Sequence, residues 1–389
     1  MDRTRGLIMV FMALDHALFF WSSGRVNNEG LPLLVNGVLT FNPIGNYNIL
    51  ALIEMFLSSL CAPGFLFIAG YVLSLSIKKR EAQGISNSNI TLHLWRRAII
   101  LIALQILIAS PAFNLPLFLQ AKSLSIVTWG TVFSLSILST FGICFFLLSL
   151  GRRLSPWILL LFSGLLYSLS LLSIPSITRN FPFQHLLGQA WQTVFILPVP
   201  FSTGLLVNNN FPVIPWFLPL TIGWLYGQTY ARDRGIAHEA KRFAVSGSLS
   251  VALFFVLRFA GIGDYLHPTA TISGFFGLSK YPPSPDYFLL YLGLIFLILW
   301  AFSKLPQTSK FGSILENFGQ APLFFYNVHL WLYAAIPALF AGFNTHSLAF
   351  GVLIWLTGLL VLYPLCQKYL AWKKSNSVRR ASRKVQTTV

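Results

Sequence analysis

Ten apolar stretches, each about as long as a helix that crosses a bilayer, follow one another along the 389 residues of this chain. A transmembrane helix needs about 20 mainly apolar residues, because the hydrocarbon core is about 30 Å thick. Helices hydrogen-bond their own backbone groups there. We therefore predict an all-α, polytopic integral membrane protein. The predicted spans are 6–22, 49–77, 94–110, 126–150, 156–174, 212–230, 243–261, 286–303, 319–341 and 346–370.

Residues 175–211 fit this count least well. Their central part, 186–207, is fairly apolar but contains Pro198 and Pro200. We interpret the segment as an external loop, and a re-entrant segment or an eleventh span are the alternatives. An eleventh span would reverse the orientation of everything after it. The basic residues after position 230 argue against that reversal.

The charge is distributed as in a membrane protein. The chain is 55% hydrophobic and 10% charged, which excludes an ordinary soluble domain of this length. If the N-terminus is cytoplasmic, all but five of the 27 Lys and Arg residues fall on or near the cytoplasmic side. This asymmetry predicts that both termini are cytoplasmic and excludes nucleic acid as a partner. The five exceptions are Arg25, Lys122, Arg179, Arg258 and Lys280.

We predict one integral membrane domain over residues 1–372 and a basic cytoplasmic tail over 373–389. The tail is rich in Lys, Arg, Ser and Thr, which predicts a disordered strip near anionic membrane lipid. The three cysteines lie in apolar stretches without the spacing of metal ligands, so no metal is predicted. Nothing in the sequence specifies an oligomeric state.

Arg5 and His16 are eleven residues apart in the first apolar stretch. Eleven steps of about 100° return close to the starting direction, so the two side chains share a helix face about 16 Å apart. An ionisable group in the hydrocarbon costs about 2.5–3.5 kcal/mol or more, which favours a wet cavity or a partner. His16 is either a core histidine hydrogen-bonded to another helix or a general base. Neighbouring Asp15 either shapes its field or forms an ion pair, with Arg258 as the expected partner.

Other polar residues gather near the external ends of the predicted spans. Arg258 is either an ion-pair partner or a group that binds an anionic substrate or an oxyanion. Tyr326 and His329 are three residues apart and share one helix face. We consider them, with Asp264 and Lys280, as structural groups or substrate-binding groups. On the cytoplasmic side, Arg5, Arg96 and Arg97 either follow the topology rule or contact the phosphates of a coenzyme.

Five blocks of the sequence resemble bacterial members of the heparan-α-glucosaminide N-acetyltransferase family. They begin at Arg5-Gly6-Leu7 with Met12 to His16, continue with Cys61 to Gly70 and Gly261 to Asp264, and end with Lys280 to Ser284 and Gly319 to His329. The blocks occur in family order and cover most of the chain. The spacing from Arg5 to His16 is also similar to the first-helix motif of the wider membrane acyltransferase superfamily.

The resemblance implies that His16 is catalytic, with Asp15 beside it. It also implies an acyl-CoA donor, typically acetyl-CoA, used from the cytoplasm, and a glycan or amino-sugar acceptor on the far side of a bacterial inner membrane. Two features depart from the family. Lysosomal members carry their active histidine in a different local context, so their heparan acceptor is not transferred to this chain. Ala260-Gly261 also replaces a more usual stretch that contains Asn.

Two functions follow from these observations. In the first, the chain is a membrane acyltransferase in which His16 acts as general base or as transient acyl carrier. In the second, the same polar residues bind and move a lipid-linked sugar without chemistry, as in a transporter or flippase. No internal repeat is evident, which weakens the transporter interpretation. For the enzyme we expect His16 to line a cavity that both membrane faces reach.

Overall fold

The computed structural model describes residues 1–25, 32–35, 38–41, 48–120, 134–180, 209, 211–230, 235–306, 308–340 and 342–386. This part of the chain is helical, apart from an antiparallel hairpin of β1 (Pro32–Val35) and β2 (Val38–Phe41). The chain divides into two compact units, and the single membrane domain over 1–372 stays a prediction. The first unit combines Met1–Arg25 with Lys304–Val389, and the second is Val26–Ser303.

The first unit is built around its N-terminal helix. Its helices are α1 (Asp2–Trp21), α14 (Lys310–Gln320), α15 (Pro322–Phe340) and α16 (Leu348–Gln386). Helix α1 packs against the other three. Gly6 on α1 meets the backbone of Leu315, and Gly319 on α14 meets the backbone of Asp2. A Cβ atom at either glycine would overlap that backbone, so these glycines permit the close helix crossing.

Two tryptophans also tie α1 to its neighbours. Trp355 Nε1 donates to the Val10 carbonyl at 3.0 Å, and Trp21 Nε1 donates to the Tyr333 carbonyl at 3.1 Å. In both bonds the indole N–H donates to a backbone carbonyl, while the rest of the large apolar ring packs in the core. They fix α1 relative to α15 and α16, and therefore fix the position of His16.

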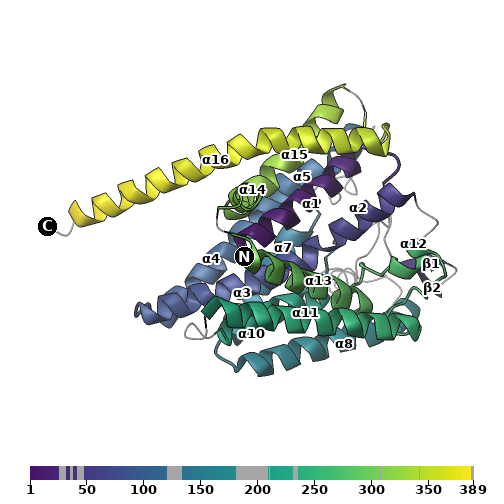
Figure 1. Ribbon diagram of the computed structural model, residues 1–389, viewed down its shortest axis with the longest axis horizontal. Helices are drawn as coiled ribbons and strands as arrows, with labels where there is room; N and C mark the ends of the chain where they lie inside the picture. Colours follow the sequence, from purple (N-terminus) through teal and green to yellow (C-terminus); the bar gives the residue numbers. More distant parts are fainter. Residues whose placement is uncertain are drawn as a thin grey trace. The chain divides into compact units, whose positions relative to one another are not determined.

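The second unit holds most of the other helices. They are α2 (Ile49–Ser59), α3 (Cys61–Ala82), α4 (Asn87–Leu104), a π-helical turn (Gln105–Ala109), α5 (Ser110–Gln120), α7 (Ile137–Gly151), α8 (Pro156–Asn180), α10 (Val213–Gln228), α11 (Gly235–Phe259), the short α12 (Ile272–Phe276) and α13 (Pro285–Lys304) (Figure 1). Helix α3 packs closely on α10, and α4 on α7. Gly70 and Gly223 allow the first of these contacts, since a Cβ on either would overlap backbone of the opposite helix.

Six described helical segments are long and apolar enough to cross a membrane. They are Asp2–Trp21, Ile49–Ala82, Asn87–Leu115, Ala237–Phe259, Pro285–Lys304 and Leu348–Asn376. Ile137–Gly151 and Pro156–Leu172 are shorter apolar helices. The prediction of a polytopic helical membrane protein is confirmed, while ten spans and cytoplasmic termini stay predictions. Most of residues 175–211 lie outside the described residues, and the side chains of 175–180 are not described. The start of the predicted span 126–150 also lies outside the described residues.

Prolines set several helix starts. Pro156, Pro285 and Pro322 are the first residues of α8, α13 and α15. Proline is favoured at the first position of a helix, because an N–H group there would have no hydrogen-bond partner within the helix. Pro322 explains why the predicted span 319–341 is divided, with α14 ending at Gln320 and α15 beginning two residues later.

The basic tail differs from the prediction of disorder. Helix α16 continues through it and ends at Gln386 (Figure 1). Residues 373–386 contain no Pro or Gly, and a helix that has already formed extends at one hydrogen bond per added residue. The backbone of this segment is therefore helical as a continuation of the apolar part of α16.

The second unit brings several basic clusters to one of its ends. Arg152, after α7, pairs with Glu81 at 3.3 Å and donates to the Asn87 side chain at 2.9 Å. Lys78, near the end of α3, donates to the Gln228 carbonyl at 2.5 Å. These contacts place the clusters that follow α3 and α7 beside the end of α10. This is the grouping that the positive-inside rule predicts for one membrane side. Arg232 and Arg234 lie outside the described residues.

Candidate functional site

Two histidines from different helices contact each other in the first unit. His16 of α1 and His329 of α15 have their Nδ1 and Nε2 atoms, respectively, 2.7 Å apart. Their rings are nearly parallel, with centroids 5.0 Å apart. His16 is 9% exposed and His329 is fully buried. The predicted core hydrogen bond of His16 to another helix is therefore present, and its partner is itself a titratable group.

Asp15 lies on the other side of His16. Its Oδ1 accepts from Arg25 Nε at 2.8 Å and from Arg25 NH2 at 2.5 Å. Its Oδ2 is 3.9 Å from His16 Nε2, too far for a hydrogen bond but close enough for a strong Coulomb interaction. Asp15 thus has Arg25 as an ion-pair partner within the same unit, and the expected pair between Asp15 and Arg258 stays a prediction. Arg258 is paired with Asp286, at 3.9 Å.

The turn that follows α1 explains why Arg25 contacts Asp15. Ser22 caps the helix in an extended conformation and forms a bridge with His346. Gly24 N then donates to Ser22 Oγ at 3.2 Å. This turn sends Arg25 back over Phe19, where its guanidinium lies 5.5 Å from the ring centroid. Arg25, four residues past the end of α1, thus folds back to an acid within that helix.

Tyr326 completes the group around His16. Its ring meets the His16 ring edge-on at a centroid distance of 6.4 Å, and the His329 ring at 5.7 Å. Its hydroxyl is buried without a hydrogen-bond partner among the described residues. Arg5, at the start of the same α1 helix, donates to the Gly319 carbonyl at 2.9 Å and pairs with Asp2 at 3.0 Å. Arg5 thus lies at the junction of α1 with α14.

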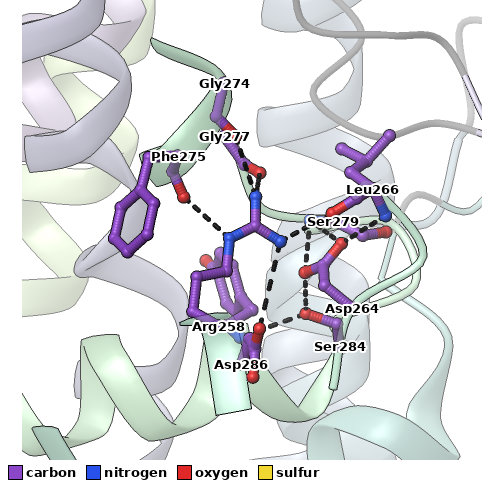
Figure 2. A network of polar contacts seen from close by, with 10 residues as sticks. Arg258, Asp264, Leu266, Gly274, Phe275, Gly277, Ser279, Ser284 and Asp286 are labelled. Atoms are coloured by element: carbon purple, nitrogen blue, oxygen red, sulfur yellow. Dashed lines mark hydrogen bonds and ion pairs between the residues drawn. The ribbon is translucent and has the colours of Figure 1, made fainter. Parts of the chain in front are cut away.

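A second polar centre lies in the second unit, around Arg258 (Figure 2). Arg258 is 1% exposed, and its guanidinium nitrogens donate to four backbone carbonyls of the segment that follows α11. The acceptors are Phe275 at 2.8 Å, Leu266 at 2.6 Å, and Gly274 and Gly277 at 2.9 Å each. These bonds take up most of the five N–H donors of an arginine. They hold the loop between α11 and α13.

Two carboxylates flank this arginine. Asp264 accepts from Leu266 N at 2.7 Å, from Ser279 N at 3.1 Å and from Ser284 Oγ. Burial raises the pKa of Asp264 above its ordinary value, while those hydrogen bonds and the charge of Arg258 oppose the rise. Asp286, in the first turn of α13, is fully buried and pairs with Arg258. Sequence reasoning missed Asp286, although an acid at the start of an apolar span was a usable signal.

The remaining predicted residues of this unit are Lys280, Arg96 and Arg97. Lys280 is buried, with Nζ 5.3 Å from the centroid of the Tyr281 ring. Arg96 and Arg97 are exposed on α4, and Arg97 lies 5.6 Å from the centroid of the Phe145 ring of α7. Among the residues that the structure describes, no group of three or more His, Cys, Asp and Glu side chains is arranged to hold a metal ion.

The structure thus groups six of the predicted residues in two centres, one in each unit. His16, Asp15, Tyr326 and His329 form the first, to which it adds Arg25. Arg258 and Asp264 form the second, to which it adds Asp286 and Ser284. Nothing local in the sequence pairs His16 with His329, because they are 313 residues apart. For Arg25, the short distance to Asp15 along the chain was the available signal.

These helices and centres define a polytopic α-helical membrane protein with buried ionisable groups. The family model described as heparan-alpha-glucosaminide N-acetyltransferase, catalytic, matches residues 37–263, which is more than half of the chain. The chain belongs to this family, which is an enzyme family of the acetyltransferase type, and the predicted resemblance is confirmed. A search of curated proteins finds no match to the chain. Arg96, Arg97 and Arg258 fall within the matched range, whereas the His16 and His329 centre lies outside it.

Proposed function

We propose that this protein transfers an acetyl group from acetyl-CoA on the cytoplasmic side to a glycan or amino-sugar acceptor on the external side of a bacterial inner membrane. Membership of an acetyltransferase family supports the reaction class. The observation that carries the proposal is the contact of His16 with His329 on one side and with the Asp15–Arg25 pair on the other. A histidine held in this way is suited to general-base catalysis.

The donor is expected to bind where basic side chains gather. Coenzyme A carries phosphates, and arginine binds phosphate oxygens with paired N–H donors. Arg96 and Arg97 are exposed on α4, in the unit whose basic clusters share one end. We assign them to the coenzyme phosphates. Arg5 is a further candidate, although its bonds to Gly319 and Asp2 already give it a structural role.

The acceptor needs polar groups that can recognise a sugar. Tyr326 offers a buried hydroxyl beside His16, and Asp264 and Lys280 belong to the loop region between α11 and α13. We keep these three and His329 as candidates for the acceptor side. Arg258 is reassigned: because its N–H groups are bonded to loop carbonyls, it positions this loop instead of binding substrate.

The test follows acetyl transfer directly. The full chain is expressed in bacterial membranes, acetyl-CoA with a labelled acetyl group is supplied on the cytoplasmic side, and label is measured in envelope glycans. We expect label to accumulate with the wild type and to fall by about 100-fold or more with His16→Ala. The matched control is His238→Ala, a histidine of α11 outside both centres. Full labelling by a folded His16→Ala variant would remove His16 from the mechanism.

The same preparation distinguishes the enzyme from a flippase. Acetyl-CoA stabilises a folded enzyme that binds it, and the stabilisation grows with ligand concentration. We expect the midpoint of thermal unfolding to rise with acetyl-CoA in the wild type, and to rise less in an Arg96→Ala/Arg97→Ala variant. An unchanged midpoint, together with sugar movement but no label transfer, would favour the flippase.

A further inference from the structure

The hydrogen bonds of His329 determine where its proton lies. His329 Nδ1 is 2.8 Å from the carbonyl oxygen of Phe325, one turn earlier in α15. A carbonyl oxygen only accepts, so Nδ1 must carry the proton of this bond. In a neutral ring the other nitrogen, Nε2, then holds a lone pair and accepts. The atom that faces this lone pair at 2.7 Å is His16 Nδ1.

The proton of His16 follows from the same rule. Because His329 Nε2 accepts, His16 Nδ1 must donate, and His16 Nε2 then carries the lone pair of the neutral ring. The alternative is a doubly protonated His329 that donates from both nitrogens. His329 is fully buried, and its ring neighbours are Phe325, Tyr326 and Tyr333. A charge in that aromatic environment is expensive without an acidic partner.

The charged groups near His16 are arranged around its other nitrogen. Asp15 Oδ2 lies 3.9 Å from Nε2, and Arg25 holds the second oxygen of that carboxylate. A proton that arrives at Nε2 therefore meets a negative charge at once. Arg25 holds Asp15 in place through two charge-assisted N–H contacts to one carboxylate oxygen. The two nitrogens of the His16 ring thus have different surroundings. His329, at Nδ1, sets the tautomer of His16, and Asp15, near Nε2, stabilises its protonated form.

We propose that His329 is a positioning residue that fixes the tautomer of His16, and that Nε2 of His16 is the nitrogen that receives the proton of the acceptor. The inference rests on the proposed acetyl transfer. As the acceptor amine or hydroxyl attacks the thioester carbonyl carbon, a C–N or C–O bond forms and the acceptor proton passes to Nε2. The C–S bond then breaks, and Nε2–H returns the proton to the sulfur, which leaves as the CoA thiol.

Two substitutions of His329 separate the hydrogen bond from the space that the ring fills. His329→Gln places an amide oxygen, an acceptor, four bonds from Cα, as Nε2 is in histidine. His329→Phe keeps a ring of similar shape but has no acceptor. Each variant is made in the full chain, purified in detergent and compared with the wild type by thermal unfolding. If activity is lost in His329→Phe but kept in His329→Gln, the loss comes from the missing hydrogen-bond acceptor and not from a change in packing.

The first measurement is independent of activity. The protein is labelled with ¹⁵N in the histidine rings, placed in lipid bilayers and studied by NMR, and the His16 signals are assigned by their loss in His16→Ala. We expect a protonated Nδ1 and an unprotonated Nε2 in the wild type at neutral pH. The same tautomer is expected in His329→Gln, and a mixture in His329→Phe. A wild-type His16 protonated at Nε2 alone would overturn the proposal.

The second measurement is kinetic. For His329→Phe we expect kcat to fall about 10–100-fold, the range seen when groups that orient a functional histidine are removed, with KM changed less than about 2-fold. His329→Gln should recover most of this loss. A phenylalanine variant with normal kcat and an unchanged tautomer would refute the positioning role. If instead His16→Ala retains full transfer, the proposed function fails while the NMR result stands, so the two failures are distinguishable.

Discussion

Arg25 Nε lies 2.8 Å from Asp15 Oδ1, and this ion pair holds the other oxygen of the carboxylate 3.9 Å from His16 Nε2. The two residues are ten positions apart, and the turn after α1 brings them together. A partly buried carboxylate is costly unless it is paired and hydrogen-bonded. The pair therefore supplies a stable negative charge beside the proposed base.

Removal of the Asp15 charge is expected to lower the rate of acetyl transfer more than it lowers the stability of the fold. For Asp15→Asn we predict a decrease in kcat of about 10–100-fold, because a protonated His16 loses its electrostatic partner. The measurement is the rate of acetyl transfer at saturating donor. Glu316→Gln is the control, since Glu316 pairs with Arg3 at 3.7 Å in the same unit. Equal rates for the two variants would show that Asp15 has no role in the chemistry.

Arg258 is predicted to matter for stability. Arg258→Met leaves Asp286 buried without its cation and leaves the four loop carbonyls without their donor. Breaking a buried charge pair in this way destabilises a protein by about 3–5 kcal/mol. We expect a lower midpoint of thermal unfolding, with partial recovery in Arg258→Met/Asp286→Leu. The control Arg153→Met removes an exposed arginine and should leave the midpoint within error.

Asp264 predicts a pH dependence of stability. Burial raises its pKa in the folded protein above the ordinary value of 3.8. The folded state then holds this proton more tightly than the unfolded state, so stability falls as pH rises through the interval between the two pKa values. Relative to Asp264→Asn, the wild type should therefore be most stable near pH 4 and lose that advantage towards neutral pH. Thermal unfolding of both proteins across this range provides the test. An advantage that grows with pH would contradict the sign of the shift.

The crossing of α3 and α10 depends on the absence of a side chain at Gly223. A Cβ there would overlap the carbonyl oxygen of Phe67, whereas a Cβ at Gly164 on α8 meets nothing within 4 Å. Gly223→Ala should destabilise the protein by about 1–3 kcal/mol, a typical effect of overpacking. Gly164→Ala should be neutral or stabilising by up to about 1 kcal/mol, because alanine favours helix. Unfolding midpoints that shift equally would mean that the crossing adapts to the larger residue.

Tyr326 allows stability and function to be separated. Its buried hydroxyl has no hydrogen-bond partner among the described residues, so Tyr326→Phe should keep or slightly raise the unfolding midpoint. If the hydroxyl contacts the acceptor, the same change should lower kcat/KM about 10-fold or more. Normal kcat/KM in a stable variant would show that Tyr326 serves only to pack against His16.

Much of the helical architecture follows from local sequence. Prolines at 156, 285 and 322 begin helices because their missing N–H groups are tolerated there. The apolar stretches at 6–22, 49–77, 94–110, 243–261, 286–303 and 346–370 all coincide with described helices long and apolar enough to cross a membrane. The π-helical turn after α4 and the helical continuation of α16 to Gln386 were not predicted. Both depend on how a helix propagates, which apolar length alone does not specify.

The sequence by itself determined the class of this protein, because apolar length and charge at the ends of spans are local properties. Its blocks of similar residues indicated the family, and an ionisable residue in an apolar helix made His16 the predicted reaction site. Only the tertiary structure decided the partners. It pairs Asp15 with Arg25, Arg258 with Asp286, and His16 with His329. Hydrogen bonds and ion pairs act over a few ångströms in space, so their partners depend on where the chain turns and which helices pack together.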